Sequence, residues 1–211
     1  MTSPTRSNPM NASRGRTVCR GLMLSLALAL CAGDPVAQAV DEPQVQSSDG
    51  LGGSLLIAAV KEKQLATLQR LINDGADINS RVTGEGTALI VACRQGNLDI
   101  VNELLRLGAD VNRSSRGDGS PLIAASINGN LSLVQRLLAA GAHVNAVVTT
   151  DETALINAVR AGRLEVVKYL VEHGADVKLG VVADNGQWRS PLNQAPDSGI
   201  KDYLVSKGAV R

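Results

Sequence analysis

Short apolar stripes alternate with glycine-rich turns along most of this chain. The segment 87–108 shows the pattern well. Thr87 offers an N-cap hydroxyl, and a first apolar face follows it at helical spacing: Leu89, Ala92 and Cys93. After the break at Gly96–Asn97, a second stripe runs through Leu98, Val101, Leu104 and Leu105. Gly108 then ends the pattern, as a C-cap glycine would. The segment therefore predicts two short helices joined by a tight turn.

This unit recurs at a constant period along the chain. The turn glycines of a Gly-Ala-Asp motif (Gly-Ala-His in one unit) are Gly75, Gly108, Gly141 and Gly174. The N-cap positions are Ser54, Thr87, Ser120 and Thr153, with the same spacing, and a shortened fifth unit runs from Ser190 to Gly208. Close approach of the first helices is predicted at the alanines Ala59, Ala92, Ala125 and Ala158. Neither helix of a unit can bury its stripe alone, so the units must stack on one another.

These two markers and their period resemble those of the ankyrin repeat family, whose unit is a turn plus two antiparallel helices with a T-P-L-H signature. The resemblance covers about residues 51–211. It departs at the signature His, which is replaced here by Ile57, Ile90, Ile123, Ile156 and Asn193. Apolar packing must therefore hold each turn in place of the hydrogen bonds of that His.

The resemblance implies an all-α ankyrin-repeat solenoid of about five helix-turn-helix units. Their approximate ranges are 51–83, 84–116, 117–149, 150–186 and 187–211. The first and last units deviate as capping units of a solenoid do. Polar residues Lys61–Gln64 replace the turn glycine of the first unit, and Pro196 shortens the first helix of the last.

Residues 1–39 are predicted to be a secretory signal peptide. Three arginines precede the apolar run 21–32, and Ala37 and Ala39 are the small residues expected before a cleavage site. Twelve residues rise only about 18 Å as a helix, short of a bilayer core of about 30 Å. A lipoprotein modified at Cys31 is an alternative, although Leu30 is larger than the residue a lipobox requires before its Cys. Residues 40–50 are predicted to be a flexible linker.

Composition agrees with a helical stack. Hydrophobic residues make up 44% of the chain and aromatic residues only 1%. The 21 basic and 20 acidic side chains exclude the broad positive surface of a nucleic-acid-binding protein. Cleavage after Ala39 would leave 17 basic and 19 acidic residues, and Cys93 as the single cysteine. No internal disulfide is then possible, which fits an exported protein that does not depend on one.

No catalytic, metal or cofactor site is indicated by the sequence. The two histidines, His143 and His173, have no metal-ligand spacing to cysteines or carboxylates. The segment 84–86 lacks the lysine and the spacing of a phosphate-binding loop. Cys93 occupies a position that is Val60, Ser126 or Val159 in other units, so we expect a buried thiol without chemistry.

The resemblance implies a concave surface that binds other proteins, formed by the finger-like turns and the first helices. The positions expected to be exposed on it form a candidate partner-binding set: Arg94, Gln95, Ile127, Asn128, Arg160, Trp188 and Arg189. Trp and Arg are enriched among interface residues with large energetic effects. For Trp188 a second interpretation stays open, in which the ring covers the last repeat.

The sequence thus predicts a non-enzymatic protein-binding module, monomeric and active in the bacterial periplasm. One unidentified protein partner is expected, with no nucleic acid, no cofactor and no stable membrane insertion after signal cleavage. An immunity or protective protein that occludes one exported enzyme is an alternative. A hydrolase with a site grafted on the stack is a further alternative.

Overall fold

The computed structural model describes residues 50–150, 152–183 and 185–210. The predicted signal peptide and residues 40–49 of the predicted linker lie outside the described residues. Gly50, the last residue of that linker, begins the first helix. Within the described part of the chain, no helix is long and apolar enough to cross a membrane.

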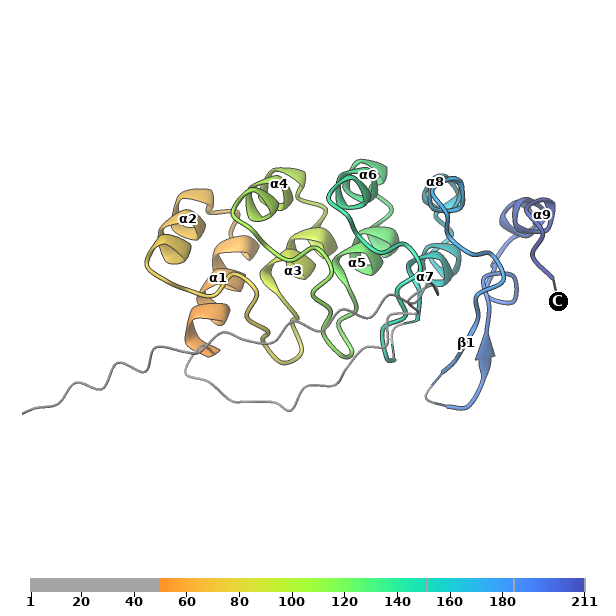
Figure 1. Cartoon of the computed structure of the whole chain (residues 1–211), viewed down its shortest axis with the longest axis horizontal. Coiled ribbons are helices and arrows are strands. Elements are labelled where there is room, and N and C mark those ends of the chain that lie inside the picture. Colours follow the sequence, from red (N-terminus) through yellow and green to blue (C-terminus); the bar gives the residue numbers. More distant parts are fainter. Residues whose placement is uncertain (1–49, 151, 184, 211) are drawn as a thin grey trace, which may run out of the picture. The chain divides into compact units, whose positions relative to one another are not determined.

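Paired helices stack in sequence order, as the period predicted (Figure 1). The pairs are α1 (Gly50–Lys61) with α2 (Leu65–Asn73), α3 (Ala88–Gln95) with α4 (Leu98–Arg106), α5 (Pro121–Asn128) with α6 (Leu131–Ala139), and α7 (Ala154–Arg160) with α8 (Leu164–Glu172). The first helices form one row and the second helices another. Along the rows, α1, α3, α5 and α7 pack in series, as do α4, α6 and α8. The mostly helical stack is thereby confirmed.

Hydroxyl groups begin α3, α5 and α7 at the predicted positions, whereas Ser54 lies inside α1, which begins four residues earlier at Gly50. The side-chain oxygen of Thr87 accepts a hydrogen bond from the Ile90 amide at 3.3 Å, and Ser120 and Thr153 do the same in the next two repeats. The isoleucines that replace the family's signature His are buried, with exposed fractions between 0 and 4%. Apolar packing therefore does hold these turns.

The core consists of small aliphatic side chains at repeating positions. The four alanines of the first helices are buried, as are the central stripe residues of the second helices, such as Val101 and Leu104. Cys93 is fully buried among them, and this burial raises the pKa of its thiol. The prediction of a packed thiol at this position is confirmed.

Asparagine side chains fasten the turn of one repeat to the turn of the next. The Asn112 side-chain oxygen accepts from the His143 amide at 2.9 Å, and its amide nitrogen donates to the Gly141 carbonyl at 3.1 Å. Asn145 makes the same two contacts one repeat further on, with Asp176 and Gly174. These contacts follow the period of the repeat but were not singled out in the sequence. At the next equivalent position the residue is Lys178.

Lateral hydrogen bonds also join neighbouring second helices. The Gln69 amide of α2 donates to Glu103 of α4, and the guanidinium of Arg136 in α6 donates to Asn102 of α4 at 2.7 Å. Hydrogen bonds from Arg106, followed by Gln69, hold the pKa of the Glu103 carboxyl at about 2, well below its usual range. The row of second helices is thus tied across the repeat boundaries by side-chain hydrogen bonds.

The fifth unit corrects the expectation of five helix-turn-helix units. Its finger is a two-stranded antiparallel hairpin, β1 (Val181–Val182) with β2 (Trp188–Arg189), and α9 (Ser198–Ser206) packs against α8. Residues 191–194 form turns in place of a first helix. Ser190 and Asn193 exchange hydrogen bonds between their backbone amides and side chains, which closes the turn early, and Pro196 follows.

The first unit exposes both polar and apolar residues. Lys63, in the position of a turn glycine, adopts a left-handed φ of 56°. Lys61–Gln64 is exposed, as expected of a polar cap, but Leu51 and Leu55 on α1 are exposed as well, by 72% and 45%.

We expect Asn112→Ala to lower the free energy of unfolding by about 1–2 kcal/mol, because two hydrogen bonds between adjacent turns are lost. Lys178→Ala, at the equivalent position two repeats on, is the matched control and should change it by less than about 0.5 kcal/mol. Urea unfolding followed by circular dichroism measures both. Equal losses in the two variants would contradict the role of the asparagine contacts.

Candidate functional site

Four fingers project beyond the row of first helices (Figure 1). They span residues 82–86, 115–119, 148–152 and 181–189, with residues 151 and 184 outside the described set. A backbone bridge closes each of the first three, for example Val82 with Gly86. The surface formed by these four fingers and the adjoining ends of α1, α3, α5 and α7 is called the finger face below.

Ion pairs connect the first helices to the fingers in successive repeats. Lys61 of α1 pairs with Glu85 at 2.5 Å, and Arg94 of α3 pairs with Asp118 at 3.5 Å, one period later in both partners. In the second pair the carboxylate is 7% exposed and the guanidinium 45%. In this pair the guanidinium is therefore the solvent-exposed group.

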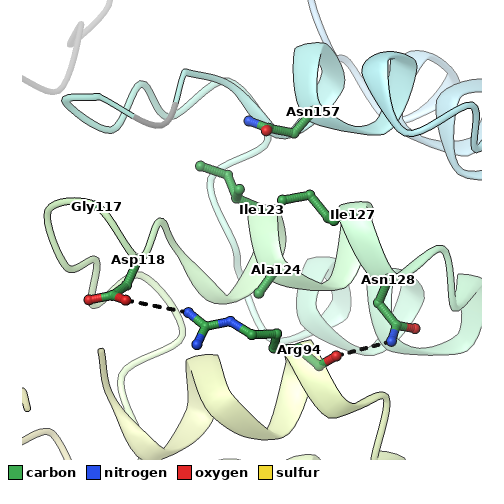
Figure 2. Close-up of a pocket in the computed structure, with 8 residues that line it drawn as sticks. All are labelled: Arg94, Gly117, Asp118, Ile123, Ala124, Ile127, Asn128 and Asn157. Carbon is green, nitrogen blue, oxygen red and sulfur yellow. Dashed lines mark hydrogen bonds and ion pairs between the residues drawn. The ribbon is translucent and has the colours of Figure 1, made fainter. Parts of the chain in front are cut away.

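The third repeat interrupts this row with an apolar residue. Ile127 of α5 occupies the position of Lys61 and Arg94, and it is 46% exposed. Beside it lies a hollow of about 420 Å³, which we call the α5 hollow. Its lining residues are Arg94, Gly117, Asp118, Ile123, Ala124, Ile127, Asn128 and Asn157. Figure 2 shows Ile123 and Ile127 on α5, between Arg94 of the preceding repeat and Asn157 of the following one.

The structure thus brings three of the sequence-predicted candidates, Arg94, Ile127 and Asn128, to one hollow. The side-chain amide of Asn128 donates to the Arg94 carbonyl at 3.2 Å, which ties α5 to α3. Gln95 is exposed at the end of α3 and is not among the residues that line the hollow.

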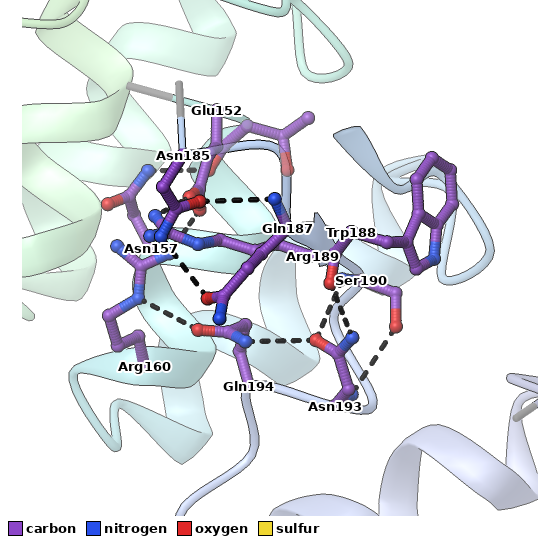
Figure 3. A network of polar contacts seen from close by, with 11 residues as sticks. Glu152, Asn157, Arg160, Asn185, Gln187, Trp188, Arg189, Ser190, Asn193 and Gln194 are labelled. Carbon is purple, nitrogen blue, oxygen red and sulfur yellow. Dashed lines mark hydrogen bonds and ion pairs between the residues drawn. The ribbon is translucent and has the colours of Figure 1, made fainter. Parts of the chain in front are cut away.

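Arg160 and Arg189, two further candidates, meet at a carboxylate that the sequence analysis did not single out. Glu152 is only 3% exposed and accepts hydrogen bonds from both guanidiniums (Figure 3). Arg160 also donates to Gln194 at 3.3 Å. This cluster joins the third finger, α7 and the hairpin of the fourth finger.

Backbone conformation explains why Glu152 is unusual. The equivalent residues in the preceding fingers are Gly86 and Gly119, with φ of 82° and 78°. Glu152 keeps this left-handed conformation with φ of 67°, and Thr150 does so at a second position that is glycine in both fingers. Such conformations cost a residue with a side chain roughly 1–3 kcal/mol. Replacement of a recurrent glycine by glutamate was the sequence signal that could have identified this residue.

Trp188 lies on the hairpin and is 57% exposed. One edge of the ring packs against Gly180. The contact is so close that a Cβ atom at this position would lie 2.3 Å from Cζ2 of the indole, so a side chain there would clash. The Trp188 carbonyl accepts from the Asn193 side chain at 2.9 Å. The residue therefore combines a packing contact with a large solvent-facing surface.

The described histidines and carboxylates do not form a metal site. No group of three or more His, Cys, Asp or Glu residues within the described part of the chain could hold a metal ion. His173 stacks on Tyr169 with ring centroids 3.8 Å apart, and His143 lies exposed in a turn. The residues that the structure describes thus offer the finger face, and not a catalytic arrangement, as the candidate functional surface.

Comparison with known protein families agrees with the repeat geometry. The family described as ankyrin repeats (3 copies) matches residues 24–115 and 114–181. The chain belongs to the ankyrin repeat family. Such repeats suggest a protein–protein interaction module, and no catalytic family was identified. A search of curated proteins found no match.

In this ankyrin repeat protein the family match ends at residue 181, where the hairpin of the fourth finger begins. The hairpin, with Trp188 and Arg189, therefore lies beyond the matched segments. Two of the seven predicted contact residues are thus carried by the part of the chain that departs most from the repeat.

We expect Glu152→Gln to lower the free energy of unfolding by about 1–3 kcal/mol, because a neutral amide cannot pair with both arginines. The hairpin should also loosen, and Trp188, the single tryptophan of the chain, reports on it. Fluorescence anisotropy of Trp188 should fall while far-UV circular dichroism stays unchanged. Asp202→Asn, at an exposed carboxylate of α9, is the control. An unchanged anisotropy in Glu152→Gln would contradict the proposed role of the cluster.

Proposed function

We propose that this ankyrin repeat protein binds a protein partner through its finger face. One observation carries the proposal: large apolar side chains are exposed there together with arginines. Ile127, Val147, Val182 and Trp188 are 43–67% exposed on or beside the fingers, and the side chains of Arg94 and Arg160 are 45% and 41% exposed. Trp and Arg are among the residues that contribute most to protein–protein affinity.

Recognition on this surface requires little rearrangement. The ends of α3, α5 and α7 rest on a fully packed core, and the turns are held by asparagine contacts between repeats. Contact residues that are already ordered lose little conformational entropy when a partner docks. We therefore expect rigid docking.

Export to the bacterial periplasm is part of the proposal. It is supported by the sequence alone, through the basic residues, the apolar run and the alanines at positions 37 and 39. Occlusion of one exported enzyme, as an immunity protein would do, is a narrower form of the same function and would use the same surface. No arrangement of groups within the described residues favours the hydrolase alternative.

If the signal is cleaved, the mature protein begins at Val40. We expect N-terminal mass spectrometry of the chain expressed in a Gram-negative bacterium to find this residue first. Ala37→Asp should leave the precursor uncleaved, because the peptidase needs a small residue there. Gln38→Asn, between the two alanines, is the matched control. A lipid-modified Cys31 at the N-terminus would overturn the proposal in favour of a lipoprotein.

Partner capture from a periplasmic extract tests the binding function. A double variant of the finger face, Gln95→Arg with Trp188→Ala, should lose the captured protein while its melting temperature stays nearly unchanged, since both side chains are exposed. The control variant Gln135→Arg with Val205→Ala makes comparable changes at exposed positions of α6 and α9. Capture that is equal in the two variants would place the binding surface elsewhere.

A further inference from the structure

The α5 hollow exists because one repeat breaks the row of cations on the finger face. The equivalent positions of the first four repeats are Lys61, Arg94, Ile127 and Arg160. A long basic side chain at Ile127 would lie across the space beside α5, as Arg94 extends from α3 to Asp118. The shorter, apolar isoleucine leaves that space open.

The floor of the hollow is apolar, and the carboxylate and amide side chains on its rim form hydrogen bonds within the protein. Ile123, Ala124 and Ile127 supply the floor. On the rim, Asp118 accepts from Ser115 and pairs with Arg94, and the Asn157 amide donates to Thr153. A polar guest side chain would lose its water without gaining these groups as new partners, whereas an apolar guest would cover the exposed part of Ile127.

Among the described residues, the solvent-exposed charge on either side of the hollow comes from Arg94 and Arg160. In the pairs of Arg94 with Asp118 and of Arg160 with Glu152, the carboxylates are 7% and 3% exposed and the guanidiniums 45% and 41%. A guanidinium has five N–H donors, and the contacts described above use only some of them.

We propose that the α5 hollow receives a single apolar side chain, of the size of leucine or methionine, from an acidic segment of the partner protein. The apolar side chain contacts Ile127, and carboxylates on either side of it along the segment pair with Arg94 and Arg160. The inference rests on the proposed function and specifies the chemistry of the partner. Apolar contact supplies the anchor, and charge complementarity selects the sequence around it.

Selection from a library of random twelve-residue peptides displayed on phage, with the full chain as immobilised target, tests this inference. Enriched peptides should carry one leucine, isoleucine or methionine with aspartate or glutamate nearby. Their affinity should fall with increasing salt, because the ion pairs on this face are open to solvent. Enrichment of basic peptides, of peptides without an apolar residue, or of no peptide would overturn the proposal.

Ile127→Arg is the decisive variant, since it restores a basic residue, as in three other repeats, at a half-exposed position and should not disturb folding. It should weaken the selected peptide by tenfold or more through occupation of the hollow. Val205→Arg, at an exposed apolar position of α9, is the matched control and should bind the peptide as the unmodified chain does. Equal binding by Ile127→Arg would overturn the proposal.

The two proposals can fail separately. Loss of the natural partner in the finger-face double variant, together with unchanged capture by Ile127→Arg, would leave the binding function standing and overturn only the role of the hollow. Capture unaffected by either variant would overturn both.

Discussion

Burial of apolar faces between neighbouring repeats is the constraint on which this structure depends. Each helix carries a narrow stripe of leucine, valine, isoleucine and alanine, too small to form a core within one hairpin. Val101 and Leu104 of α4 are fully buried, and α4 packs against α3 of its own repeat and against α6 of the next. The alanines of the first helices permit neighbouring repeats to approach closely. Close approach is needed because the chain has almost no aromatic residues to fill a wider gap.

The same constraint explains where the chain can vary. Positions facing a neighbouring repeat are restricted to residues that pack, and turn positions with positive φ favour glycine. Residues on the finger face are less restricted by packing, and the residues that distinguish this protein from a regular repeat lie there. Ile127 interrupts the row of cations, and Glu152 occupies a glycine position whose conformational cost is offset by two arginines. The repeats thus provide a regular support on which a few exceptional residues mark the candidate site.

The candidate residues illustrate how far sequence reasoning could reach. Arg94, Ile127 and Asn128 were selected by repeat position, and the structure places them at one hollow because the period repeats their location on successive helices. Glu152 was missed because a single carboxylate in a turn has no pattern of its own until two arginines, from α7 and from the hairpin, meet it. The fifth unit was expected to begin with a shortened helix. Hydrogen bonds between Ser190 and Asn193 close a turn there instead, and the period of the sequence contains no information about these contacts.

By itself, the sequence determined the repeat, the helix pairs, the N-caps and the buried alanines, because these follow from spacing along one chain and from contacts that recur in every repeat. Only the tertiary structure decided which polar groups pair across repeats, how the last finger folds and where the surface is hollow. Those features depend on side chains from two or more elements meeting in space. Periodicity places such side chains near one another, and the geometry of packing selects the contacts that form.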